Sequence, residues 1–172
     1  MPVYAFGEAV PDIDPTAYVH PDAVIIGHVR IGPESSVWPC AVLRGDDGRI
    51  EVGARTSIQD GSVLHCTPDL ATVVGDDCVV GHIVHLEGCT VEDGSLVGNG
   101  SVVLHRAVIG RGALVGSNAV VPADVVVPPG ALALGVPARI REGGADGELI
   151  RYAAASYVDR ARRFRTELRR IG

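Results

Sequence analysis

The feature that most constrains the fold of this chain is a repeat of six residues. Aliphatic side chains return at every sixth position in consecutive groups of three, and Gly often follows them. A period of six matches neither the 3.6 residues of an α-helical turn nor the simple alternation of a hairpin strand. It matches short strands joined by tight corners, with three strands to a coil and the aliphatic side chain inward. The repeat predicts an all-β solenoid, a parallel β-helix. The repeated positions are Ile31, Val37, Leu43, Val52, Ile58, Leu64, Val74, Val80, Leu86, Val91, Val97, Val103, Ile109, Val115 and Val121.

Two segments and the C-terminal part of the chain depart from this repeat. Residues 46–51 and 67–72 interrupt it, and we expect them to leave the coils as loops. After Pro137 the aliphatic positions take helical spacing, and Asp146 is a suitable N-cap for a helix that follows it. We expect a β-helix domain over residues 1–137, and a linker with an amphipathic helix packed on it over residues 138–172.

Composition argues against nucleic acids and membranes as binding partners. A chain of 172 residues suits one domain, and its net charge of -6 argues against a general nucleic-acid surface. No apolar run approaches the roughly 20 residues that span a bilayer, and the start MPVYAFGEAV lacks the order of a signal peptide. We therefore expect a cytoplasmic protein that binds neither nucleic acid nor membranes.

The repeat also places polar residues in columns, because equivalent positions on successive coils lie about 4.8 Å apart. One column contains Arg44, His65 and Glu87, and a second contains Asp60, His82 and Asn99. His85 and Glu87 flank an inward leucine, so both point outward. The two columns of one subunit need not converge, whereas columns of adjacent subunits can meet. This arrangement predicts a metal site between the subunits of a homotrimer, built from imidazole and carboxylate donors.

Two stretches carry a resemblance to a known family. WPCAVLRGDDGRIEVGARTSIQDGSVLHC (38–66) and VGDDCVVGHIVHLEGC (74–89) closely resemble the gamma-class carbonic anhydrases and their bacterial homologues. The resemblance covers most of the chain and implies a left-handed, trimeric β-helix of hexapeptide repeats. It also implies reversible hydration of CO2 to bicarbonate by metal-bound hydroxide, with Zn2+ or Fe2+ as the metal.

The resemblance assigns roles to particular positions. His65 and His82 match two metal ligands, with His82 supplied by the neighbouring subunit. The other matches border the site or orient the metal-bound water in the family: Arg44, Asp46, Gln59, Asp60 and Tyr157. Asp47, in an expected loop, is a candidate proton-transfer group.

The third metal ligand is where this chain departs from the family pattern. The pattern places a His at position 87, where this sequence has Glu87, and a His stands two residues earlier at position 85. Three interpretations follow. Glu87 ligates the metal, His85 replaces it after a local shift, or the metal site is lost. A carboxylate ligand offsets more of the metal charge than an imidazole does, so CO2 hydration at neutral pH is expected to be weak or absent.

Two other classes of function remain open. Trimeric β-helices of this kind also serve as acyl-CoA-dependent acyltransferases or thioesterases, for which His85 or His105 would be the catalytic residue. The chain would alternatively be a non-catalytic trimeric protein, in which His82, Glu87 and Arg44 only join the subunits.

Overall fold

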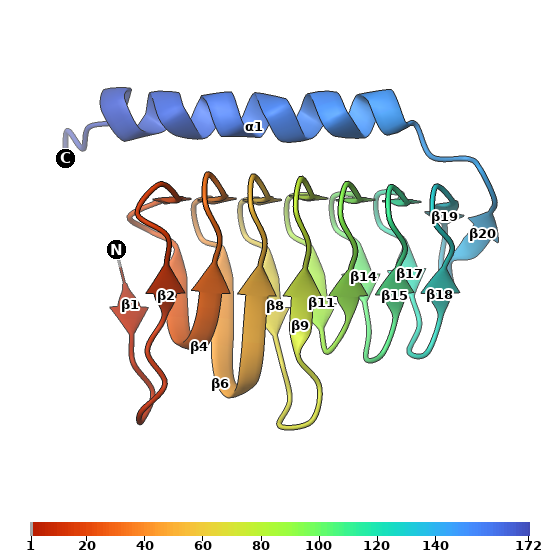
Figure 1. The fold of residues 1–172 in the computed structure, drawn as a ribbon, viewed down its shortest axis with the longest axis horizontal. Helices are drawn as coiled ribbons and strands as arrows, with labels where there is room; N and C mark the ends of the chain where they lie inside the picture. Colours follow the sequence, from red (N-terminus) through yellow and green to blue (C-terminus); the bar gives the residue numbers. More distant parts are fainter. Residues whose placement is uncertain (1) are drawn as a thin grey trace.

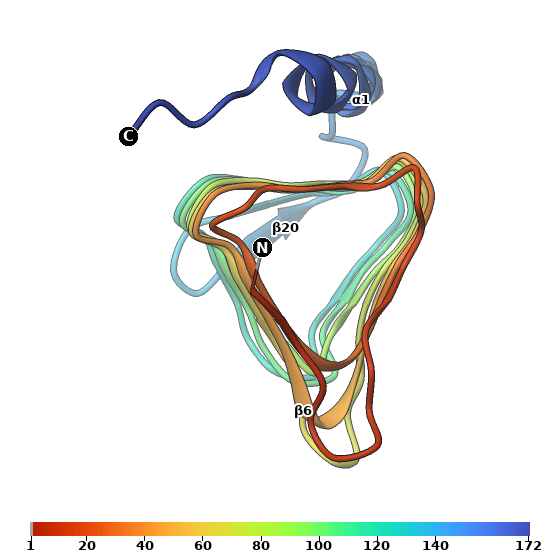
Figure 2. The same cartoon turned by 90° about the vertical axis from the view of Figure 1, so that its left-hand side faces the viewer.

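Short strands stack into three flat faces, which form the parallel β-helix expected from the repeat, with the left hand that the family resemblance implies (Figure 1). The computed structural model describes residues 2–172. Seen along its axis, the solenoid is triangular, and the single helix drawn lies over one side only (Figure 2). We name the three sides the helix face, the histidine face and the open face.

Each face is a stack of strands in register, which are parallel except for the last strand of the helix face, antiparallel to its neighbour. The helix face contains β3 (Tyr18–Val19), β5 (Ser36–Val37), β7 (Ser57–Ile58), β10 (Val79–Val80), β13 (Leu96–Val97), β16 (Leu114–Val115), β19 (Leu132–Leu134) and β20 (Arg139–Arg141). The histidine face contains β1 (Val3–Tyr4), the first part of β4 (Val24–Ile31), the first part of β6 (Val42–Val52), β8 (Val63–His65), β11 (His85–Glu87), β14 (Val102–Val103) and β17 (Val120–Val121). The open face contains β2 (Asp12–Ile13), the ends of β4 and β6, β9 (Thr72–Val74), β12 (Thr90–Val91), β15 (Val108–Ile109) and β18 (Val126–Val127).

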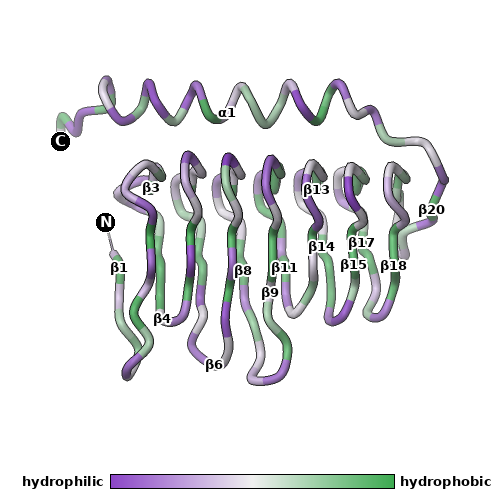
Figure 3. Tube along the Cα trace, viewed as in Figure 1, coloured by the Kyte–Doolittle hydropathy of each residue, from purple (hydrophilic) through white to green (hydrophobic). Residues whose placement is uncertain are grey.

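The core is the stack of inward aliphatic side chains that the repeat predicts. On the histidine face, Leu43 pairs with Leu64, and Leu64 with Leu86, all fully buried. All fifteen repeated aliphatic positions are buried, so this prediction is confirmed. Apolar residues recur along the strands of every coil, and hydrophilic residues gather at the corners (Figure 3). Burial of such side chains is the main favourable term in folding, and each coil adds its own layer to the core.

The first expected loop is a strand. Residues 46–51 remain inside β6, which runs continuously from the histidine face to the open face around a protruding corner (Figure 2). The expectation of a loop was wrong because β6 is paired with β4 on both sides of this corner. Gly45 pairs with Gly27 and Ile50 pairs with Val29, and residues 46–49 form the irregularity between them. A Cβ atom on Gly27 would lie 2.3 Å from the Gly45 carbonyl oxygen, so this close approach requires glycine. The second expected loop is confirmed over residues 67–71, and Thr72 begins β9.

The C-terminal helix forms where the sequence predicts it. α1 (Gly147–Glu167) begins after Asp146, whose side chain accepts hydrogen bonds from the backbone N–H groups of Glu148 and Leu149. Such a cap satisfies donors that have no partner within the helix. None of the helices described in residues 2–172 has the combined length and apolar character needed to cross a membrane.

An aromatic cluster attaches α1 to the helix face. Trp38 packs against Tyr157 and Phe164 of the helix, with ring centroids 5.5 and 5.0 Å away, and Tyr18 also contacts Phe164. The indole N–H of Trp38 points toward the hydroxyl oxygens of Ser36 and Ser57, 3.0 Å from each. The polar end of Trp38 is therefore satisfied while its ring supports the helix.

We predict that Phe164→Ala destabilises the docking of α1 by about 2 kcal/mol, since it removes a large, partly buried ring from this cluster. Urea unfolding followed by fluorescence of Trp38, the single tryptophan, measures the change. Tyr152→Ala is the matched control, because Tyr152 lies on the same helix with 75% of its surface exposed and should change stability by less than about 0.5 kcal/mol. Equal effects of the two substitutions would contradict this account of helix docking.

Candidate metal and acid-base site

Glu87 lies at the centre of a group of imidazoles on the histidine face. One carboxylate oxygen is 2.8 Å from Nδ1 of His65 and 3.7 Å from Nε2 of His105. The other oxygen is 3.3 Å from Nε2 of His85. We call this group, together with Arg44 and Asp46, the Glu87 cluster. A single carboxylate thus faces histidines from three successive coils.

Strand register produces the Glu87 cluster. Arg44 in β6 pairs with His65 in β8, and His65 pairs with Glu87 in β11, as the column analysis predicts. Leu86 is fully buried, which turns its two neighbours in β11 outward. The positions of these side chains therefore follow from the burial of one leucine per coil.

The His65 ring lies between two carboxylates. Its Nε2 atom is 3.3 Å from Oδ1 of Asp46, and its Nδ1 atom contacts Glu87. Asp46 is in turn bonded by the guanidinium of Arg44. A neutral imidazole carries only one N–H, so it can donate to only one of the two carboxylates. His65 can therefore exchange one of these contacts for another partner while the other contact keeps its ring oriented.

Both carboxylates of the Glu87 cluster are held in the charged form. The hydrogen bond from His65 lowers the pKa of Glu87, against the opposing effect of burial, and His85 adds to the lowering. For Asp46, burial acts to raise the pKa, but the Arg44 guanidinium and further hydrogen bonds together bring it below its ordinary value. Charged carboxylates are the form that accepts hydrogen bonds or binds cations.

His82 belongs to a different part of the molecule, the corner between the helix face and the histidine face. Its Nδ1 atom is 2.9 Å from Oδ2 of Asp60, and its backbone N–H donates to the Asn99 side chain. This confirms the second predicted column. Gln59, next to Asp60, is buried. Tyr157 lies on this side too, where burial raises the pKa of its phenol and the Asp60 charge raises it further.

The predicted site residues therefore form two separate groups within one chain. Arg44, Asp46, His65, His85 and Glu87 lie together, whereas Gln59, Asp60, His82 and Tyr157 lie around the corner. Within residues 2–172, no three His, Cys, Asp or Glu side chains are arranged to hold one metal ion. A three-ligand site that uses both groups requires a second copy of the chain.

His105 is the member of the Glu87 cluster that sequence reasoning did not place there. It follows Leu104, whose backbone stacks one coil beyond Glu87, and its Nε2 atom is buried without a hydrogen-bond partner. The stacking of coils could have predicted this contact. The side chain of His105, just after a strand end, turns back toward Glu87 of the preceding coil, so the columns of stacked residues extend to corner positions as well as strand positions.

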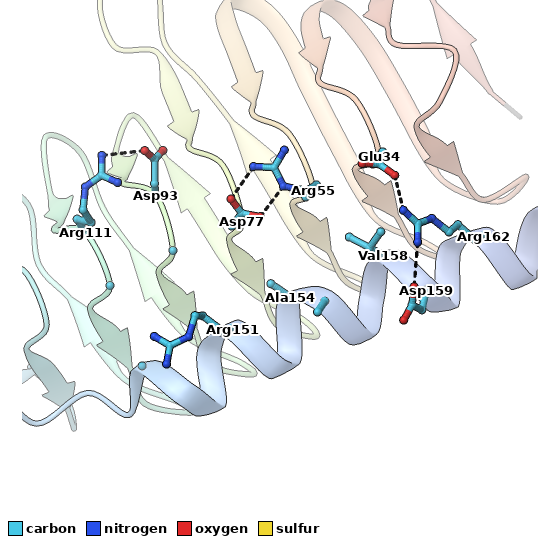
Figure 4. A pocket seen from close by; sticks show the side chains of 14 residues that line it. Glu34, Arg55, Asp77, Asp93, Arg111, Arg151, Ala154, Val158, Asp159 and Arg162 are labelled. Carbon is cyan, nitrogen blue, oxygen red and sulfur yellow. Dashed lines mark hydrogen bonds and ion pairs between the residues drawn. The ribbon is translucent and has the colours of Figure 1, made fainter.

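A groove of about 620 Å³ lies between α1 and the corner that joins the open face to the helix face (Figure 4). Most of its charged side chains neutralise one another. Arg162 pairs with Glu34 at 2.6 Å, Arg55 with Asp77 at 2.6 Å, and Arg111 with Asp93 at 2.8 Å. Only α1 and this corner line the groove, and none of the predicted site residues contributes to it.

Comparisons with known proteins find the same kind of repeat and the same fold in other proteins. The bacterial transferase hexapeptide (six repeats) family matches residues 88–123. The BC4754 gene product of Bacillus cereus, named as a candidate acetyltransferase, has a structure that covers 96% of this chain, with 98% of its own length covered, a TM-score of 0.94 and 34% identity. A hexapeptide transferase family protein from Anaplasma phagocytophilum covers 94% of the chain, with 96% of its own length covered, a TM-score of 0.90 and 33% identity.

The carnitine operon protein CaiE of Escherichia coli O157:H7 is similar over a shorter span. It is 45% identical over 91 residues, which are 53% of this chain and 46% of that protein. The chain thus spans about half the length of the curated relatives it matches.

We predict that Glu87→Gln lowers the melting temperature of the metal-free protein by about 2–4 °C at pH 7, from the loss of about 1 kcal/mol of charge-assisted hydrogen bonding. Because folding lowers the pKa of Glu87 from 4.5, its contribution is present above that value and disappears as the pH falls through the folded pKa. Thermal unfolding of both proteins with a chelator present, at pH 7 and near pH 3, measures the difference. A constant gap at both pH values would show that Glu87 stabilises the fold by packing alone.

Proposed function

The chain belongs to the hexapeptide-repeat family of left-handed β-helix proteins, and on this premise we propose that it is a gamma-carbonic-anhydrase-like metalloprotein. Its metal site would lie between the subunits of a homotrimer and take CO2 or bicarbonate as substrate. The observation that carries the proposal is the division of the donors. His65 and Glu87 touch on one face, whereas His82 is held by Asp60 at a corner of the same chain.

The donor types fit zinc or ferrous iron. Imidazole nitrogen and carboxylate oxygen are common ligands of both metals. A metal-ligating histidine usually has its other ring nitrogen bonded to a carboxylate, and Asp46 would fill that role for His65 while Glu87 binds the metal. Asp60 would do the same for His82. Each histidine of the proposed site thus already has a partner that orients its ring.

Glu87 is a better candidate than His85 for the third ligand. Glu87 contacts His65 directly, whereas the Nε2 atom of His85 contacts Glu87. His85 therefore contacts the carboxylate oxygen that His65 does not contact, and it would orient the carboxylate. The family position is occupied by a residue able to bind a metal, and the extra histidine two residues earlier supports it.

The residues around the donors would bind and orient the reactants. A metal held here would supply an acidified water for attack on CO2. Arg44 keeps Asp46 charged beside His65, and Gln59 with Asp60 provides polar groups on the His82 side. Asp47 is exposed next to the site and would carry protons to solvent. As a ligand, Glu87 would offset part of the metal charge and make that water harder to ionise, so activity at neutral pH should be weak.

We predict that the protein binds one zinc ion per chain and that His65→Ala, His82→Ala and Glu87→Ala each weaken binding by about 100-fold or more, since each removes a donor. His85→Ala should weaken it by about tenfold, the size of effect typical of a residue that orients a ligand. Isothermal titration calorimetry of metal-free protein measures all four. A larger loss with His85→Ala than with Glu87→Ala would make His85 the ligand, and no zinc binding by the parent protein would favour a purely structural trimer.

We also predict that Glu87→His raises the rate of CO2 hydration at pH 7 by about tenfold or more, because one unit in the pKa of the bound water changes its ionised fraction tenfold. Stopped-flow assays with a pH indicator, from pH 6 to pH 9, test this. The parent protein should gain activity toward high pH, and Glu87→Gln serves as the uncharged control. Full activity of the parent protein at pH 7 would contradict the electrostatic argument.

Acyl transfer from a coenzyme A ester is the second candidate function. Two observations favour it: two structural relatives that are similar over nearly their whole length carry transferase names, and His105 has a buried ring nitrogen 3.7 Å from Glu87. An imidazole beside a carboxylate can act as a general base toward an acceptor hydroxyl or amine. Thermal-shift measurements separate the two functions, because protection by acetyl-CoA without protection by zinc would favour acyl transfer.

A further inference from the structure

Ile83, the residue after His82, has an unusual backbone conformation for its type. It lies at the corner between the helix face and the histidine face with a φ angle of 58°. The coil before it has Gly61 at the equivalent corner position, and the next two coils have Gly100 and Asn118, all with positive φ. Glycine and asparagine adopt this conformation readily, whereas a β-branched residue there is an outlier with a strained backbone. Among the positive-φ residues described, Ile83 alone is β-branched.

The side chain of Ile83 gains nothing within its own chain that offsets this strain. It is 72% exposed, with the inward residues on both sides of the corner already buried in the core. A strained backbone and an exposed apolar side chain are both unfavourable in an isolated chain. Burial of the side chain against another subunit would offset both costs.

The histidine face offers an apolar surface that no helix covers. Its outward side chains include five valines in register with His85, which we call the valine column: Val24, Val42, Val63, Val102 and Val120. Val63 is 37% exposed, and the other four are partly exposed. The corresponding column of the open face mixes valines with charged and polar residues, so the valine column is the more apolar of the two; its members are Asp12, Arg30, Glu51, Val73, Thr90, Val108 and Val126.

We propose that Ile83 is the docking residue of this protein and packs on the valine column of a second copy. This inference rests on the proposed inter-subunit site, because the copy that receives Ile83 then receives His82 beside its own His65 and Glu87. The partner is another copy of this chain. The donors on the histidine face lack a third member, and the corner of a second copy carries it.

The spacing of the residues is compatible with this contact. His82 and Ile83 are consecutive, so their Cα atoms are about 3.8 Å apart. Outward residues of a strand repeat every two positions, about 6.6 Å apart, and the valine column stands two positions from the His65 and Glu87 column. A copy that brings His82 to Glu87 therefore brings Ile83 within one side chain's reach of the valines.

Sedimentation velocity over a range of protein concentrations tests the proposal. Ile83→Asn places at this corner the residue that Asn118 already provides at the equivalent position, so the fold should be kept. We expect Ile83→Asn to raise the concentration at which trimers dissociate at least tenfold, with an unchanged circular dichroism spectrum. Asn118→Gly, in the same corner column, is the matched control and should assemble as the parent protein does. Ile83→Gly relaxes the backbone as well and decides the matter if Ile83→Asn fails to fold.

The outcomes separate this inference from the proposed function. A trimeric parent protein whose assembly is unchanged in Ile83→Asn and Ile83→Gly would overturn the role of Ile83 and leave the proposed metal site standing. A parent protein that is monomeric at every concentration would overturn both. His82→Ala supplies a further distinction. It should lose zinc but remain trimeric, whereas Ile83→Asn should recover zinc binding when its concentration is raised enough to restore the trimer.

Discussion

Parallel stacking of coils around a single column of aliphatic side chains is the constraint on which the rest of the structure depends. Leu43, Leu64 and Leu86 lie in register and fully buried, so the outward residues beside them must also stack. Arg44, His65 and Glu87 become neighbours although 43 positions separate the first from the last. The chemistry on the surface is therefore a consequence of how the core packs.

The stack explains what the sequence could and could not predict. The coils, the two polar columns and the capped helix followed from a period of six and from Asp146, because local burial and capping decide them. The strand character of residues 46–51 did not follow. It depends on the pairing of β6 with β4 on both sides of this corner and on the close approach of Gly27 to Gly45, which are contacts between residues far apart in the chain. His105 was likewise missed as a neighbour of Glu87, since a corner side chain turns back in a direction that the period alone does not give.

Glu87 also changes the electrostatic environment of the histidines around it. With an imidazole at position 87, the face would carry a row of bases with similar properties. With a carboxylate there, His65, His85 and His105 all face one negative charge, and their contacts lower the pKa of Glu87. A metal ion at this position would compete with these hydrogen bonds. Metal affinity would then depend on how firmly the histidines hold the carboxylate, as well as on the number of donors.

The shape of the solenoid gives a physical reason for dividing a site between chains. The outward side chains of a flat parallel face all point away from the core, so they cannot surround an ion from opposite sides. Two neighbouring coils can present two donors, as His65 and Glu87 do at 2.8 Å, but a tetrahedral ion needs another donor from a different direction. The corner that carries His82 and Ile83 projects away from its own histidine face. An ion on the outer surface of this solenoid can therefore be enclosed only where a second solenoid packs against it. The same contact between subunits would then both assemble the protein and complete the set of ligands.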